Sequence, residues 1–246
     1  FSIYFMIQYI EVRDNKNYLD VNRMIEDSVI LNEDGLRFGG VVNLPAGHFF
    51  ISEPIRLWKL FGIKIAGQGM QTILTYDGDR NLPVFDLRDV RYPRIESFSI
   101  KAKLNYTDSQ PGAKAAFCLA RHQELDNNYN SSGAILKDIQ FGSGGGLPDF
   151  KYGILISSTE WGGPDANNDI NMFDQLRIQG YSEAAIHIAP GSSQATHSNT
   201  FSNCIFNGGG IAKYGFYTGS TLNRVRVSFL GGGHTVSDIY LAEVGG

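Results

Sequence analysis

The sequence contains little cysteine, no dense basic cluster and no long hydrophobic run, and each shortage excludes a class of protein. The two cysteines, Cys118 and Cys204, lie far apart in different parts of the chain, so we expect both to be free thiols. The net charge is −4 and no Lys/Arg cluster interrupts this mild acidity, so we expect no nucleic-acid partner. The apolar segment 1–10 is too short to cross a bilayer, so we expect no membrane span.

The usual motifs of metal and serine chemistry are also missing. No two histidines stand at the spacing that zinc sites use, and both cysteines stand alone. No G-x-S-x-G sequence occurs either. We therefore expect no metal cofactor and no serine nucleophile.

Residues 39–69 contain the clearest structural unit, and it reads GGVVNLPAGHFFISEPIRLWKLFGIKIAGQG. Short β-branched and aromatic runs alternate in it with proline and glycine turns. Ile63 and Ile65 flank Lys64, which is the two-residue period of a strand with one buried face. Because so short a strand cannot bury its apolar face alone, the sequence predicts that similar units stack on it.

A helix is expected just before this unit, over residues 19–31, because Val21, Met24, Ile25 and Val29 recur at helical spacing. This helix, followed by the GGVVNLPAGHFFI and GIKIAGQG runs, resembles the N-terminal coils of the pectate-lyase-like superfamily of right-handed, single-stranded parallel β-helix proteins. The His-Phe-Phe sequence at 48–50 departs from the small residue and tyrosine that are usual in that family.

The resemblance implies an all-β fold, a right-handed parallel β-helix that forms a single domain over residues 1–246. Residues 19–31 would be the N-terminal cap, and the C-terminal end would have no cap. Because the superfamily includes polysaccharide lyases, glycoside hydrolases and phage tailspikes, the resemblance indicates a fold more specifically than an activity.

Two sets of apolar pairs alternate along the sequence from residue 63 onward, as two faces of a repeating structure would. The first column consists of Ile63/Ile65, Phe98/Ile100, Ile139/Phe141, Leu176/Ile178, Cys204/Phe206 and Val227/Phe229. The second column consists of Phe85/Leu87, Phe117/Leu119, Ile154/Ile156, Ile186/Ile188, Phe216/Thr218 and Ile239/Leu241. A polar residue that we expect to satisfy turn backbone precedes the later pairs of the first column, at Asp138, Gln175, Asn203 and Arg226.

Long polar segments interrupt the repeats, and the segment after residue 156 contains the best candidates for catalysis. Glu160, Asp165 and Asp169 lie there on a glycine- and asparagine-rich stretch, and Trp161 follows the first of them. Two carboxylates beside an aromatic ring are the minimal set for glycosidic cleavage, because one protonates the leaving oxygen while the other activates water or attacks carbon. Asp149 is a further candidate for the second carboxylate, while turn formation is the alternative role for all of these residues.

Outward positions between the apolar pairs provide candidates for substrate binding. His187, Tyr217 and Tyr240 would form an aromatic row if the strands stack in register, suited either to an extended glycan or simply to sheet stabilisation. Arg177 lies at an outward position of the first column and is a further candidate.

The sequence thus favours a carbohydrate-active protein that cleaves the glycosidic bonds of a polysaccharide or oligosaccharide, outside the cell or on a virion. One alternative is a polysaccharide lyase of the pectate type, which would require calcium. The other is a non-catalytic glycan-binding tailspike or adhesin module. A homotrimer or an additional C-terminal domain would cover the last repeat, whose open end would otherwise expose apolar core.

Overall fold

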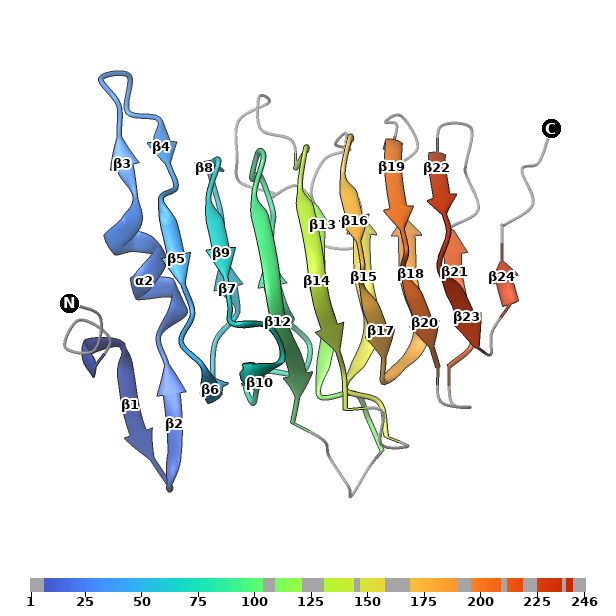
Figure 1. Cartoon of the computed structure of the whole chain (residues 1–246), viewed down its shortest axis with the longest axis horizontal. Helices are drawn as coiled ribbons and strands as arrows, with labels where there is room; N and C mark the ends of the chain where they lie inside the picture. Colours follow the sequence, from blue (N-terminus) through green and yellow to red (C-terminus); the bar gives the residue numbers. More distant parts are fainter. Residues whose placement is uncertain are drawn as a thin grey trace.

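A computed structural model describes residues 7–103, 109–120, 131–143, 147–157, 169–189, 196–208, 212–218, 225–235 and 238–240 of the chain. The described residues are mostly β-strands arranged side by side from one terminus to the other, with one α-helix near the N-terminus (Figure 1). All strand pairs are parallel except β1–β2 and β3–β4. The prediction of an all-β chain is confirmed.

Helix α2 spans Val21–Ser28 and lies within the predicted range of 19–31. The carboxylate of Asp20 accepts a hydrogen bond of 2.9 Å from the backbone N–H of Arg23 and caps the first turn. Val21, Met24 and Ile25 are buried, as their spacing predicts. The helix is shorter than expected because Val29 is already extended, with φ −73° and ψ 135°.

The largest sheet, called here the first sheet, has 14 described strands. Nine follow one another in space: β1 (Ile10–Arg13), β2 (Lys16–Leu19), β6 (Gly47–Ile51), β10 (Thr72–Tyr76), β12 (Arg94–Ala102), β14 (Ile135–Phe141), β16 (Met172–Asp174), β19 (Thr196–Ser202) and β22 (Val225–Leu230). Five shorter strands extend these rows: β5 (Val41–Asn43), β9 (Lys64–Ala66), β17 (Arg177–Gln179), β20 (Ile205–Asn207) and β23 (Gly233–Thr235).

Two smaller sheets complete the described structure. The second sheet contains β7 (Ile55–Arg56), β11 (Pro83–Asp86), β13 (Ala113–Ala120), β15 (Phe150–Ser157), β18 (Tyr181–Ala189), β21 (Tyr214–Thr218) and β24 (Asp238–Tyr240). The third sheet contains β3 (Ile30–Leu31), β4 (Arg37–Phe38) and β8 (Leu60–Phe61). Two 3-10 turns, η1 (Ile7–Tyr9) and η2 (Gly69–Gln71), complete the elements.

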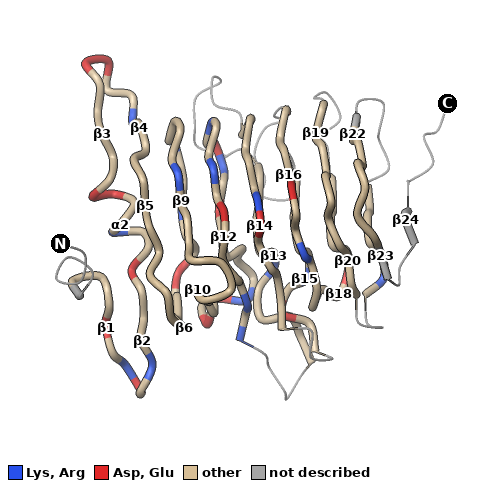
Figure 2. The backbone as a smooth tube through the Cα atoms, viewed as in Figure 1, with Lys and Arg blue, Asp and Glu red and all other residues tan. Residues whose placement is uncertain are grey.

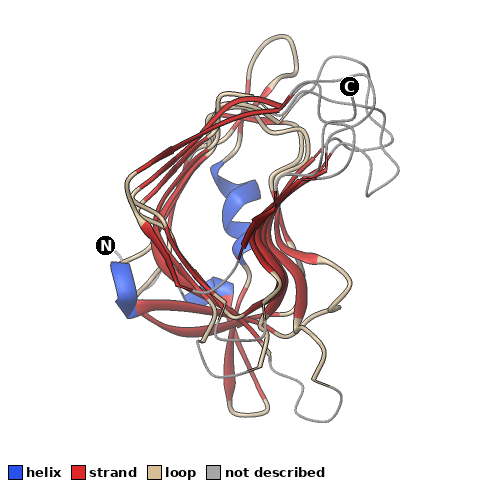
Figure 3. Ribbon diagram, turned by 90° about the vertical axis from the view of Figure 1, so that its right-hand side faces the viewer, coloured by secondary structure: helices blue, strands red, loops and turns tan. Residues whose placement is uncertain are grey.

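The chain passes from β12 onward alternately through the first and the second sheet, and the apolar core lies between them. In the end-on view of Figure 3 the strands of successive turns lie one behind another, with α2 at the far end of the interior. The core includes fully buried aromatic side chains from both sheets, among them Phe85, Phe117 and Phe141. Phe85 and Phe117 stack with their ring centroids 4.7 Å apart. Neither Cys118 nor Cys204 forms a disulfide, as predicted, and both side chains are buried.

The predicted second column is confirmed wherever the structure describes it. Phe85, Phe117, Ile154, Ile186 and Phe216 lie opposite one another on consecutive strands, and Ile239 continues the row. Leu241, the last residue predicted for this column, lies outside the described residues.

The predicted first column is wrong at both ends. Phe98, Ile139, Leu176 and Cys204 do follow one another on one side of a bend in the first sheet. Ile65, however, lies opposite Ile95 on the other side of the bend. Phe229 likewise lies opposite Phe201 and not Phe206. Each turn of the chain therefore contributes two apolar groups to the first sheet, one on each side of the bend. The sequence analysis counted them as one column.

Charged side chains on the outer face of the first sheet pair between neighbouring strands. Lys64 of β9 binds Glu96 of β12 at 2.8 Å, and Lys137 of β14 binds Asp174 of β16 at 3.5 Å. In Figure 2, basic and acidic positions lie side by side on adjacent strands of this sheet. They stabilise the packing of successive turns by small amounts, since exposed ion pairs contribute about 0–1 kcal/mol each.

Candidate functional site

The second sheet aligns the outward residues that the sequence analysis selected for substrate binding. His187 of β18 lies opposite Leu155 of β15 on one side and opposite Tyr217 of β21 on the other. The backbone of Tyr240 lies opposite Tyr217 in the next strand. These residues come together because each strand pairs in parallel with the next and keeps its register over the outward position.

The described rings of this row stack on one another. The imidazole of His187 lies 4.8 Å from the ring of Tyr152 and 4.8 Å from that of Tyr217, nearly parallel to both. Tyr214 stacks on Tyr217 at 5.0 Å. Because neighbouring rings cover one another's faces, the stack stabilises the sheet, and Tyr152 and His187 are only 7% and 5% exposed. Tyr214 and Tyr217 are half-buried, so they are the more accessible rings of this row.

Arg177 does not join this row. It lies exposed on β17 of the first sheet, opposite Gln140 of β14 and Ile205 of β20. The sequence analysis placed Arg177 at an outward position of the first column, and it lies away from the aromatic row because the two sheets lie on different sides of the core. Its neighbours on the two adjacent strands are thus one polar residue, Gln140, and one aliphatic residue, Ile205.

Asp149 is a buried structural carboxylate. Its side chain has no exposure and accepts hydrogen bonds from the Ala102 N–H at 3.1 Å, the Ser143 N–H at 2.9 Å and the Ser143 hydroxyl at 2.8 Å. Burial raises the pKa of Asp149, although these hydrogen bonds act in the opposite direction. The carboxylate ties together the ends of three segments, and it is closed off from any substrate.

The neighbouring glycine shows how tightly Asp149 is held. Gly180 has φ +63°, and a Cβ added to it would lie 2.6 Å from one carboxylate oxygen of Asp149. Only glycine combines this backbone conformation with so close an approach.

Three of the other predicted site residues, Glu160, Trp161 and Asp165, lie outside the described residues. Asp169 is described and half-buried, and it lies three positions before Met172, where β16 begins. Its backbone carbonyl accepts a 3.0 Å hydrogen bond from the N–H of Gly133. The structure therefore fixes the position of one candidate carboxylate, at the point where the chain enters the first sheet.

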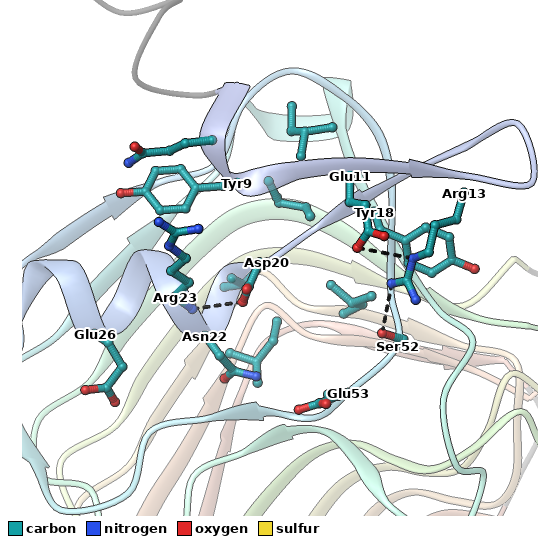
Figure 4. A pocket seen from close by; sticks show the side chains of 16 residues that line it. Tyr9, Glu11, Arg13, Tyr18, Asp20, Asn22, Arg23, Glu26, Ser52 and Glu53 are labelled. Atoms are coloured by element: carbon teal, nitrogen blue, oxygen red, sulfur yellow. Dashed lines mark hydrogen bonds and ion pairs between the residues drawn. The ribbon is translucent and has the colours of Figure 1, made fainter.

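A hollow of about 590 Å³ at the N-terminal end was missed by the sequence analysis (Figure 4). It lies between the hairpin of β1 and β2, helix α2 and the turn that carries Ser52 and Glu53. The guanidinium of Arg13 lies 4.0 Å from the centroid of the Tyr18 ring and 3.4 Å from the carboxylate of Glu11. The side chains along one wall thus contact one another across the hairpin.

The signal for this hairpin was present in the sequence. Asp14 and Asn15 separate two short strands, and both have positive φ, 49° and 59°. Asp and Asn are the non-glycine residues that adopt this conformation most readily, and a two-residue turn of this kind joins antiparallel strands.

A second hollow, of about 390 Å³, lies on the flank of the second sheet. Its lining includes Arg80, Lys114 and Lys151, which are far apart in the sequence. Parallel pairing of β11, β13 and β15 brings these residues together. No local feature of the sequence therefore identifies them as a group.

Two further observations concern the described part of the chain. Within it, no group of three or more His, Cys, Asp or Glu side chains is placed to hold a metal ion. None of its helices has the length and apolar character needed to cross a membrane.

No protein-family model matches the sequence, and no curated protein matches it. Among solved structures, ORF18 of Geobacillus virus E2 is similar with a TM-score of 0.31 and 12% sequence identity. The match covers 93% of this chain and 59% of that chain, so this chain spans less than two thirds of its length. At this TM-score the likeness establishes neither the fold nor a function.

Proposed function

We propose that the chain is a right-handed parallel β-helix of the pectate-lyase-like type that binds a polysaccharide and cleaves its glycosidic bonds. The observation that carries the proposal is the register of the second sheet. Cys118, Leu155, His187 and Tyr217 lie opposite one another on four consecutive parallel strands. Equivalent positions recur about every 4.8 Å along such a row. Cys118, Leu155 and His187 are buried, so in this proposal the sugar meets the row at the half-buried ring of Tyr217.

The cleavage chemistry in this proposal uses Glu160, Asp165 and Asp169. One carboxylic acid protonates the leaving oxygen, and a second carboxylate activates water or attacks the anomeric carbon. Trp161 provides an aromatic face for the sugar. Asp149 is left out, because its buried oxygens are occupied by structural hydrogen bonds.

The test is incubation of the purified chain with a panel of polysaccharides, with reducing ends and ultraviolet absorbance measured in parallel. We expect new reducing ends without absorbance from at least one polysaccharide. Glu160→Gln or Asp169→Asn should lower the rate by about 100-fold or more, as loss of an acid or base does. The control Asp174→Asn removes a carboxylate that pairs with Lys137 on the first sheet, and it should leave the rate unchanged. Rates that are equal in all four proteins would contradict the proposed chemistry.

The same assay separates hydrolysis from elimination. A calcium-assisted lyase of the pectate type would produce an unsaturated sugar that absorbs in the ultraviolet, and a calcium chelator would stop it. Under the hydrolase proposal, chelation leaves the rate unchanged.

The burial of Asp149 also favours a second candidate function, a non-catalytic glycan-binding tailspike or adhesin module outside the cell or on a virion. Exposed apolar side chains near the last strands of the first sheet, Phe229 at 43% and Leu230 at 57%, suit a chain that assembles as a homotrimer or packs on another domain. Such a module would bind glycans without releasing sugar, and light scattering would give the mass of a trimer. A monomer that releases sugar would exclude it.

A further inference from the structure

The first strand of the first sheet, β1, has an open edge within the described part of the chain. It lies at the N-terminal end of the row of strands and pairs on one side only, with β2 (Figure 1). Three of its four residues, Glu11, Val12 and Arg13, are exposed, and Val12 is 68% exposed. Strand edges of this kind bind a further strand readily, because their backbone groups already form an extended row.

The hydrogen bonds of the hairpin show which backbone groups face this edge. In an antiparallel pair, facing residues alternate between those that exchange hydrogen bonds and those that do not. The carbonyl of Tyr9 accepts a 2.8 Å hydrogen bond from the N–H of Asp20, next to the facing pair of Ile10 and Leu19. Counted from this bond, Ile10 and Val12 point their N–H and C=O groups away from β2. These two residues therefore present hydrogen-bonding groups to the open edge.

The side chains of β1 place opposite charges on either side of an apolar residue. The guanidinium of Arg13 lies 3.4 Å from the carboxylate of Glu11, on one face of the hairpin (Figure 4). These side chains are 47% and 69% exposed, respectively. Val12 points to the opposite face, because successive residues of a strand alternate between faces. The acid and the base thus lie at equal distances along the strand from Val12.

This arrangement is complementary to itself in one antiparallel register. When Val12 faces Val12 of a second copy, the N–H of each donates to the C=O of the other. Glu11 of each copy then faces Arg13 of the other, and the two opposite-charge pairs lie on either side of a two-fold axis. The strand edge therefore fits a second copy of this chain through both its backbone groups and its charges.

The neighbouring registers that keep the backbone hydrogen bonds lack this charge pairing. With Ile10 opposite Val12, Glu11 of one copy faces Glu11 of the other, and like charges that face each other across strands repel. With Ile10 opposite Ile10, Glu11 faces Tyr9 and forms no ion pair. The charges therefore select the register in which Val12 faces itself.

We propose that two copies of the chain associate through an antiparallel β1–β1 pair, which joins their first sheets across a two-fold axis. Stable interfaces bury about 1,200–2,000 Å², and a four-residue edge buries less. We therefore expect a weak dimer, with a dissociation constant of about 10 µM to 1 mM. The interface lies at the opposite end of the first sheet from β22, and it does not depend on glycan binding or cleavage.

The test is sedimentation equilibrium of the whole chain at concentrations up to about 1 mM. We expect a reversible monomer–dimer equilibrium that weakens as salt is added, because exposed ion pairs are screened. Glu11→Arg and Arg13→Glu each place like charges opposite one another, so each should weaken self-association at least ten-fold. The control Glu33→Arg makes the same change of charge at an exposed turn and should leave the dimer unchanged.

Charge exchange tests the register itself. In an equimolar mixture of Glu11→Arg and Arg13→Glu, every facing pair between unlike chains has opposite charges, so a mixed dimer should form. The double variant Glu11→Arg/Arg13→Glu should regain self-association for the same reason. Failure of both the mixture and the double variant to associate would overturn the proposed register.

Val12→Lys tests the centre of the interface, because it places two cations opposite each other at the two-fold axis. Val12 is largely exposed, so this variant should keep the thermal unfolding midpoint of the monomer while self-association is lost. A natural chain that remains monomeric over the whole concentration range would overturn the proposal. So would a dimer or trimer whose affinity is the same in Val12→Lys and in both charge variants, because the copies would then associate through another surface.

Discussion

At the scale of single residues, the bend in the first sheet depends on a column of residues with left-handed backbone conformations. Ser97, Asp138, Gln175 and Asn203 have φ between 51° and 60° at the same point of four successive turns. The sequence analysis predicted a structural role for the last three, and their positive φ gives the physical reason. The prediction for the fourth residue, Arg226, was wrong, because Gly231 with φ +67° occupies the bend of the last turn.

Replacing Gln175 by valine should destabilise the protein. A β-branched residue in a left-handed conformation costs about 1–2 kcal/mol, whereas Gln175→Gly should cost little. Urea unfolding measures the difference. The control Gln179→Val lies in β17, without positive φ, and it should cost less than Gln175→Val. Equal losses for the two valine variants would show that the bend carries no strain.

Asp149 gives a second prediction at this scale, in the dependence of stability on pH. Because burial raises its pKa above the usual 3.8, the folded protein favours the protonated carboxyl. The stability from this group is full at acidic pH and is lost as the pH rises through the raised pKa. Urea unfolding from about pH 3 to about pH 7 should show this loss in the natural chain and not in Asp149→Asn. The same slope in both proteins would contradict the assignment.

At the scale of elements, buried side-chain amides join consecutive strands β14, β16 and β19. The side-chain oxygen of Asn171 accepts a 2.9 Å hydrogen bond from the N–H of Ala134. The side-chain oxygen of Asn199 accepts from the Asn171 amide at 2.7 Å and from its backbone N–H at 3.2 Å. Both asparagines are at most 1% exposed, so each turn depends on the next for its polar groups.

Asn199→Ala should therefore destabilise the chain by about 1–3 kcal/mol for each donor of Asn171 left without a partner. Thermal or urea unfolding provides the measurement. Asn43→Ala, at an exposed position of β5, is the matched control and should change stability by less than about 0.5 kcal/mol. A loss no larger than that of the control would mean that water replaces the amide without cost.

The sequence predicted some elements better than others, for a physical reason. The second sheet and helix α2 follow from simple periods of two and of three to four residues, such as Ile154 with Ile156 or Val21 with Ile25. The first sheet bends within each turn, so apolar residues on both sides of the bend look alike. Ile95 and Phe98 belong to different columns although they are only three positions apart in the sequence. Local spacing cannot assign a column when two lie so close together.

At the scale of the whole molecule, the candidate sites depend on neighbours that sequence distance conceals. His187 and Tyr217 were grouped correctly because both lie in the regular second sheet. Arg177 was assigned to the other column and lies on the first sheet, whereas the cations around Lys114 were not grouped at all. Register between successive turns, which no local motif encodes, decides which side chains share a surface.

The most direct measurement of the central claim is binding of the full chain to an array of polysaccharides, followed by calorimetry on the best of them. We predict saturable binding to at least one polysaccharide. Tyr217→Ala should weaken it, because this half-buried ring is where a ligand reaches the aromatic row of the second sheet. Arg177→Ala on the first sheet should have no effect. An array on which the folded chain retains no polysaccharide would contradict the account.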